Sequence, residues 1–132
     1  MKKTKTITVG YPVSSVYRYL KNIEHYAHHL GSACKVVDKE GLVASVDAPL
    51  VGKIMAVITT RVIDTKVEMS AKKIGTILTA DLEELSESKT RIKLSMDVNP
   101  KLGFTTNIAI EAFAPQALDK VADELSTTDF EK

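Results

Sequence analysis

The stretch KLGFTTNIAIEAFAPQALDKVADELS, residues 101–126, decides how the rest of this 132-residue chain can fold. Its apolar residues form two helical stripes, one of Phe104, Ile108 and Ala112 and one of Leu118, Val121, Ala122 and Leu125. At about 100° per residue the stripes are offset by roughly a quarter turn, and the break falls at Pro115, which lacks a backbone donor. The spacing predicts one long helix kinked at Pro115. Two helices, with Pro115 opening the second, are the alternative.

The middle of the chain, residues 33–98, alternates apolar and polar residues in short segments separated by turn residues. Connections such as DKEG, PLVG and SESK are polar or contain glycine, as in the hairpins of an antiparallel meander. The stretch KTKTITV near the start has the same alternation. The pattern predicts strands over residues 3–9, 33–38, 42–48, 53–63, 65–72, 75–85 and 89–98.

Two short helices are predicted between the first two strands. The first follows Ser14, which can cap it, and has an apolar stripe at helical spacing made of Val13, Val16, Tyr17 and Leu20. The second ends at Gly31 and repeats the spacing with Ile23, Tyr26, Ala27 and Leu30. An antiparallel sheet of this length needs its apolar face covered, and only the last helix is long enough to cover it. We therefore expect an α+β chain whose sheet curls around that helix.

This element order resembles the START-like superfamily, also called SRPBCC or the helix-grip fold, whose best-known members are of the birch-pollen-allergen type. The local signal is the strand TITV followed by YPVSSVYRYLKNIEHYAHHL, in which a proline precedes a Val–aromatic pair, a leucine and a second aromatic helix. The chain departs from many relatives in having no tryptophan and no glycine-rich loop after an early strand. Few Asn and Gln beside many Lys, Glu, Ile and Val suggest a small thermophilic archaeal branch.

The resemblance implies one helix-grip domain over residues 1–132, with a seven-stranded curved antiparallel sheet, two short helices between strands 1 and 2, and a long C-terminal helix. It also implies a cavity between sheet and helix, which the family uses for lipids, sterols, hormones and polyketides. The residues support this because small side chains recur on the inward strand face, chosen by where charges fall: Leu42, Ala44, Val46, Ala48, Ile54, Ala56, Ile58, Val67, Met69, Ala71, Leu78, Ala80, Leu82, Ile92, Leu94 and Met96. The alternative is a solid core in which the alanines permit close approach.

The expected function is an intracellular binding protein or carrier for a hydrophobic or amphipathic small ligand, lipid- or fatty-acid-like. The ligand-binding residues expected are Tyr17, Leu20, Tyr26, Leu30, Val46, Ala48, Ala56, Ile58, Val67, Met69, Leu78, Ala80, Leu94, Met96, Phe104, Ile108 and Ala112. One alternative is a polyketide cyclase or aromatase-type enzyme in which Tyr17 or Tyr26 acts as acid or base. Another is an interaction or co-chaperone module with a vestigial cavity.

The histidines form a second candidate site. Relative to Ile23 on the second predicted helix, Tyr26 lies within about 60°, while the histidines fall between about 140° and 240°. They are His25, His28 and His29. Histidines at this spacing can chelate zinc, but catalytic zinc needs a third ligand and a positioned acid or base, as in HExxH, and the sequence here is HYAHH. A solvated helix face is therefore expected, with no metal and no cofactor.

Composition narrows the remaining classes. The 18 Lys and Arg balance 17 Asp and Glu, so no nucleic-acid partner is expected, and no apolar run approaches the roughly 20 residues of a membrane span. The single cysteine, Cys34, excludes an internal disulfide and fits a reducing cytoplasm. Arg61 lies in the apolar strand IMAVITTRVI. Facing outward it would mark a homodimer surface, and facing inward it would meet a fatty-acid carboxylate.

Overall fold

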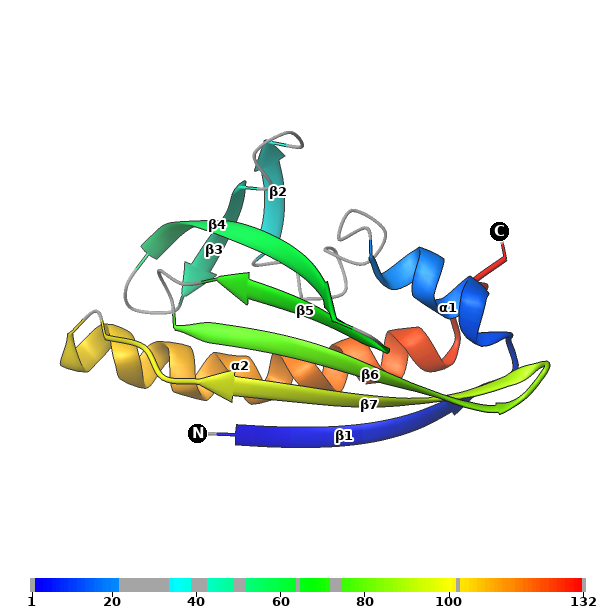
Figure 1. Ribbon diagram of the computed structural model, residues 1–132. Helices are drawn as coiled ribbons and strands as arrows, with labels where there is room; N and C mark the ends of the chain where they lie inside the picture. Colours follow the sequence, from blue (N-terminus) through cyan, green and yellow to red (C-terminus); the bar gives the residue numbers. More distant parts are fainter. Residues whose placement is uncertain are drawn as a thin grey trace.

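The computed structural model describes residues 2–21, 34–38, 43–48, 52–63, 65–71, 75–101 and 103–131 (Figure 1). Its elements in chain order are β1 (Lys2–Val9), α1 (Val13–Leu20), β2 (Cys34–Asp38), β3 (Val43–Ala48), β4 (Gly52–Ile63), β5 (Lys66–Ala71), β6 (Thr76–Ser86), β7 (Lys89–Val98) and α2 (Phe104–Ser126). The second short helix expected at residues 23–30 lies outside the described residues.

The strands form one antiparallel sheet in the order β1-β7-β6-β5-β4-β3-β2. Each strand from β2 to β7 pairs with its neighbour in the chain, as hairpin connections dictate, and β1 closes the order by pairing with β7. α2 runs along one face of this sheet (Figure 1). The expected α+β architecture, an antiparallel sheet with a C-terminal helix against it, is therefore confirmed.

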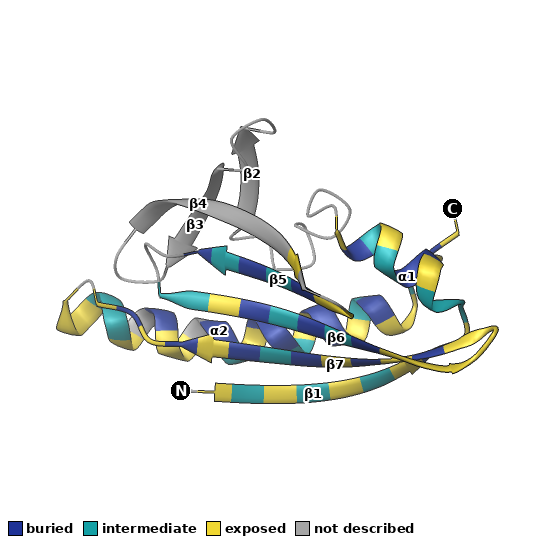
Figure 2. Ribbon diagram, in the orientation of Figure 1, coloured by how far each residue is buried: buried dark blue, intermediate teal, exposed yellow. Residues whose placement is uncertain are grey.

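Burial alternates residue by residue along β5, along β7 and along β6 as far as Leu82, as Figure 2 shows. Side chains of period two place every second residue on the face that α2 covers. The inward positions expected on these strands are all buried, namely Val67, Met69, Ala71, Leu78, Ala80, Leu82, Ile92, Leu94 and Met96. The side chains of the other inward positions, from Leu42 to Ile58, lie outside the description.

α2 is one helix that continues through Pro115, so the two-helix alternative is wrong. The proline removes the donor to the Glu111 carbonyl, but Glu111 is exposed, so water can reach that oxygen. The second stripe, from Leu118 to Leu125, is fully buried and holds the helix on the sheet. Packing of this face therefore outweighs the single lost hydrogen bond.

α1 begins two residues earlier than a Ser14 cap would place it. The carbonyl of Pro12 accepts hydrogen bonds from the backbone N–H groups of Ser15 and Val16, at 3.1 and 3.2 Å, and no side chain caps the helix. Pro12 is fixed near the φ that precedes a helix, so it can start one without a side-chain cap. Val16 and Leu20 are buried in the core that α2 and the sheet share.

Candidate ligand site

The inner face of β5, β6 and β7 is a continuous apolar surface. In the strand register Leu78 stands opposite Met69 on one side and Met96 on the other. The next row along the strands, Val67, Ala80 and Leu94, is also buried. Neither row contains a group that can donate or accept a strong hydrogen bond. Any molecule that lies against these two rows must therefore present apolar groups to them.

The C-terminal half of α2 is buried in the core along one stripe. Its stripe Leu118, Val121, Ala122 and Leu125 is 0% exposed, and Ala114 and Ala117 beside it are buried. These alanines let the helix approach the sheet closely, because their side chains add little bulk between the two layers. Around this stripe the helix is packed against the core.

The N-terminal half of α2 behaves differently. Its first turns extend past the start of β1 and the end of β7 (Figure 1). Phe104 is 83% exposed and Ile108 is 51% exposed, and Ala112 is exposed as well. These residues belong to the stripe that is offset by roughly a quarter turn from the buried one, whereas Ile110, which lies within about 20° of Val121 on the helix surface, is buried. Phe104, Ile108 and Ala112 therefore do not belong to the packed core.

The remaining expected contacts are only partly described. Leu20 is buried in the core, and Tyr17 is half-buried with the Lys21 ammonium 5.7 Å from its ring centre, a cation–π contact. Residues outside the description, wholly or in their side chains, are Tyr26, Leu30, Val46, Ala48, Ala56 and Ile58. The histidines lie outside it too, and the described residues contain no group of three metal-ligating side chains.

Ion pairs close the interior along the edge formed by β1. Lys3 donates a hydrogen bond of 3.0 Å to Asp119, and Lys5 lies 3.6 Å from Asp119 and 3.7 Å from Asp123, so both lysines reach from β1 to α2. The hydrogen bond from Lys3 lowers the pKa of the Asp119 carboxyl, and the charges of both lysines add to this. Sequence periodicity did not indicate these pairs, because the partners lie more than a hundred residues apart.

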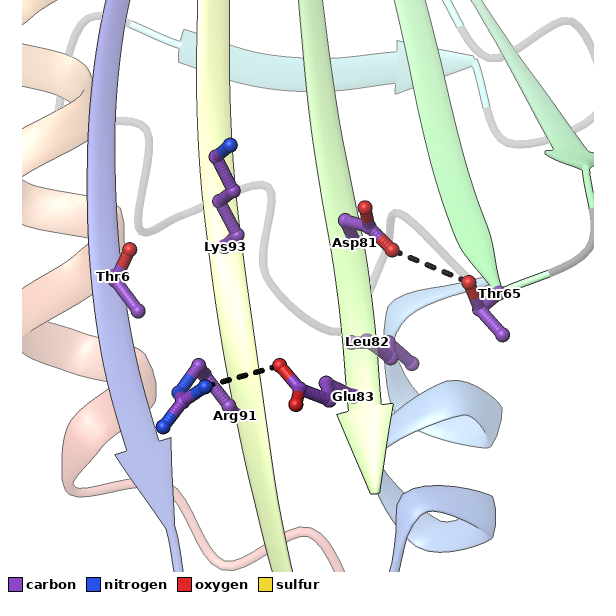
Figure 3. A pocket seen from close by; sticks show the side chains of 7 residues that line it. All are labelled: Thr6, Thr65, Asp81, Leu82, Glu83, Arg91 and Lys93. Carbon is purple, nitrogen blue, oxygen red and sulfur yellow. Dashed lines mark hydrogen bonds and ion pairs between the residues drawn. The ribbon is translucent and has the colours of Figure 1, made fainter. Parts of the chain in front are cut away.

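The outer face of the sheet carries a polar depression of about 550 Å³. Figure 3 shows its lining residues, which are Thr6, Thr65, Asp81, Leu82, Glu83, Arg91 and Lys93. Arg91 pairs with Glu83 at 3.1 Å, and Thr65 donates to Asp81 at 3.2 Å. Balanced charges and hydroxyls make this surface unsuitable for an apolar ligand.

Two further expectations concern the strand face on which Arg61 lies and the presence of a membrane-spanning helix. Arg61 stands opposite Glu68 in the register of β4 and β5, and Glu68 belongs to the outer face because it alternates with the buried Val67 and Met69. Among the helices in the described part of the chain, none is both long enough and apolar enough to cross a membrane.

This architecture can be compared with those of known proteins. No protein-family model and no curated protein matches the chain. Solved structures do match it. The solution structure of KanY protein (ms6282) superposes with a TM-score of 0.66 at 14% identity, covering 96% of this chain and 94% of that one. The Zhui aromatase/cyclase from Streptomyces sp. R1128 has a TM-score of 0.65 at 14% identity, with 93% and 92% covered.

A START superfamily protein from Mycobacterium smegmatis matches with a TM-score of 0.56 at 12% identity, covering 94% of this chain and 98% of that one. These identities speak to fold alone. The archaeal origin suggested by composition stays a prediction. The order of elements, the antiparallel sheet and the C-terminal helix against its apolar face agree with these structures: the chain has the START-like, or SRPBCC, fold.

Proposed function

We propose that this protein binds a hydrophobic or amphipathic small molecule, lipid- or fatty-acid-like, between its sheet and α2, and carries it unchanged. The observation that supports this best is the uninterrupted apolar inner face of β5 to β7, with Met69, Leu78 and Met96 in one row. Methionine side chains adapt to irregular apolar shapes, which suits a flexible chain. The START-like fold agrees with such a role.

Within this proposal the ligand lies toward the N-terminal half of α2, because the C-terminal half is packed against the core. The exposed Phe104 and Ile108 supply apolar surface there that no described residue covers. The proposal keeps the expected helix-grip arrangement of seven strands and two short helices around the ligand. The proposal also takes the chain as a single domain, places the protein inside the cell and leaves room for a homodimer.

Cyclase-type catalysis is the second candidate, favoured by the likeness to the Zhui aromatase/cyclase. Tyr17 supports it locally, since its half-buried ring packs against the core and the Lys21 ammonium lies over the ring face, 5.7 Å from the ring centre. A phenol hydroxyl can donate a proton to a developing enolate. Under this reading Tyr17→Phe abolishes turnover of a polyketide substrate and leaves binding intact.

The test of the carrier is native mass spectrometry of freshly purified protein, followed by extraction and mass identification of whatever leaves it. We expect one lipid-like mass near one per chain, recovered unchanged after incubation, and the same spectrum reports the oligomeric state. A transformed mass supports the cyclase. A protein that is empty, ignores fatty acids and fluorescent apolar probes, and copurifies with another protein would overturn both in favour of an interaction module.

A matched pair of variants locates the site. Ile108 and Ile77 are both partly exposed isoleucines, 51% and 40%, but Ile108 lies on α2 and Ile77 on β6. Replacing Ile108 by serine removes apolar contact worth about 1 kcal/mol, so affinity for an apolar probe should fall about fivefold to tenfold. Ile77→Ser should leave affinity unchanged. Equal effects of the two substitutions would place the ligand elsewhere.

A further inference from the structure

An aromatic cluster joins the two ends of the described chain at α1. Phe130, in the segment that follows α2, is only 4% exposed. Its ring makes edge-on contacts with Tyr11, at 5.4 Å between ring centres, and with Tyr19, at 5.1 Å. Such pairs stabilise beyond their burial alone by about 0.5–1.5 kcal/mol each. Phe130 is therefore the anchor of the segment that follows the last helix.

Hydrogen bonds fasten the same segment. The buried Ser15 hydroxyl on α1 donates to the Glu131 carboxylate at 3.4 Å. Thr128 donates to the Glu124 carbonyl at 2.7 Å, which turns the chain back from the end of α2. Beneath the cluster, the buried Thr90 donates to the Tyr11 carbonyl at 2.8 Å. The segment 127–131 thus contacts α1 through the ring of Tyr19 and the hydroxyl of Ser15, and it contacts Tyr11 just before that helix.

The pKa values of Tyr11 and Tyr19 are both raised in this cluster. Burial raises the pKa of Tyr11, and the nearby carboxylates Asp129 and Glu131 raise it further. Burial also raises the pKa of Tyr19, with Glu124 adding to the effect and a hydrogen bond with Thr128 opposing it. Both tyrosines are therefore neutral at physiological pH, and the contact does not depend on their ionisation.

α1 needs this support because it is short. It has eight residues, and isolated helices below about 12 residues are unstable in water. Val16 and Leu20 attach one side of it to the core, and the 127–131 segment attaches the other. A helix held only by tertiary contacts docks or detaches as a unit, with a local free energy below that of global unfolding.

We propose that residues 127–131 form a clasp that holds α1 over this end of the interior, and that release of Phe130 lets α1 detach and opens the apolar core there. Figure 1 shows α1 beside the end of α2, where the clasp lies. The opening itself is independent of any ligand. Its use as a gate for ligand exchange rests on the proposed function.

Hydrogen exchange tests the clasp, and a phenylalanine at the opposite end of α2 provides the matched control. Phe130→Ala removes a buried ring at one end of α2, and Phe104→Ala removes an exposed ring at the other. We expect amides of residues 13–20 to exchange at least about tenfold faster in Phe130→Ala than in the parent, with β7 unchanged. Phe104→Ala should match the parent. Trypsin cleavage after Arg18 and Lys21, both exposed, should rise in parallel.

Two results would overturn the clasp: exchange in α1 that is the same in Phe130→Ala as in the parent, or equal acceleration in α1 and β7, which means that Phe130 only adds global stability. If Phe130→Ala does not fold, Phe130→Leu keeps apolar volume without the ring contacts and is judged by the same criteria.

Binding of 1-anilinonaphthalene-8-sulfonate tests the gate separately. We expect the probe to associate faster with Phe130→Ala by a factor similar to the gain in exchange. An unchanged association rate removes the gating role. A parent protein that binds no apolar probe refutes the proposed function, while hydrogen exchange still decides the clasp.

Discussion

The turn between β5 and β6 contains a glycine at a position where a side chain would collide with backbone atoms. Gly75 has φ +60°, and its carbonyl accepts a hydrogen bond from the Asn99 N–H at 2.7 Å. A Cβ added there would collide with the Asn99 carbonyl, lying 2.6 Å from its carbon and 2.7 Å from the Pro100 Cα. All these atoms are backbone, so no side-chain rotation relieves the contact. Gly75 therefore packs directly against the backbone that connects β7 to α2.

Gly75→Ala should cost about 3 kcal/mol of unfolding free energy. The left-handed conformation contributes about 1 kcal/mol, the lost or strained hydrogen bond about 1 kcal/mol, and displacement of the backbone at Asn99 the rest. Two other glycines separate these causes. Gly103 has φ +117° with open space around a Cβ, so Gly103→Ala carries strain alone, about 1–2 kcal/mol. Gly10 has neither feature, so Gly10→Ala should stay within about 0.5 kcal/mol.

Urea denaturation, monitored by circular dichroism, measures the unfolding free energy of the parent and the three variants. We expect the loss of stability to rise from Gly10→Ala to Gly103→Ala to Gly75→Ala, with similar denaturant slopes. A Gly75→Ala protein no less stable than Gly103→Ala would refute the backbone collision. A Gly10→Ala protein as damaged as Gly75→Ala would refute the whole argument from conformation.

Three other outcomes follow from burial and charge. Ile110, 4% exposed, and Ile108, 51% exposed, are two residues apart in α2, so Ile110→Ala should lower the unfolding free energy by about 2–4 kcal/mol and Ile108→Ala by less than about 1 kcal/mol; equal losses would contradict the assigned helix face. The pKa of Asp119 is lowered in the folded protein, so its contribution to stability is present above the ordinary value of 3.8 and is lost as the pH falls through the folded pKa. Asp119→Asn should therefore reduce stability at neutral pH but not at pH values below the folded pKa, in thermal unfolding at low salt, and a difference that persists in acid would be inconsistent with the pair to Lys3. Thr90→Val should cost about 1–3 kcal/mol, because the partly buried Tyr11 carbonyl loses its donor, and an unchanged midpoint of denaturation would show that water replaces the hydroxyl.

Local pattern was sufficient for the elements of the described fold. The expected segments 75–85 and 89–98 differ from β6 and β7 by at most one residue at an end. Side chains alternate strictly across a strand, so the choice of Leu78, Ala80 and Leu82 as inward residues followed from where the charges stood. The helical spacing of α2 was equally local. A chain whose strands precede one long amphipathic helix has few other ways to cover its sheet.

The sequence by itself determined that α2 has two apolar stripes, and only the tertiary structure decided which one is covered. The stripe at Leu118 is buried against the sheet, whereas Phe104 and Ile108 are exposed, and the way the helix docks on the sheet leaves no local trace in the residues. Phe130 was missed for a related reason. A single aromatic residue in a polar tail has no periodicity. Its partners, Tyr11 and Tyr19, lie near the other end of the sequence, and only folding brings them to it.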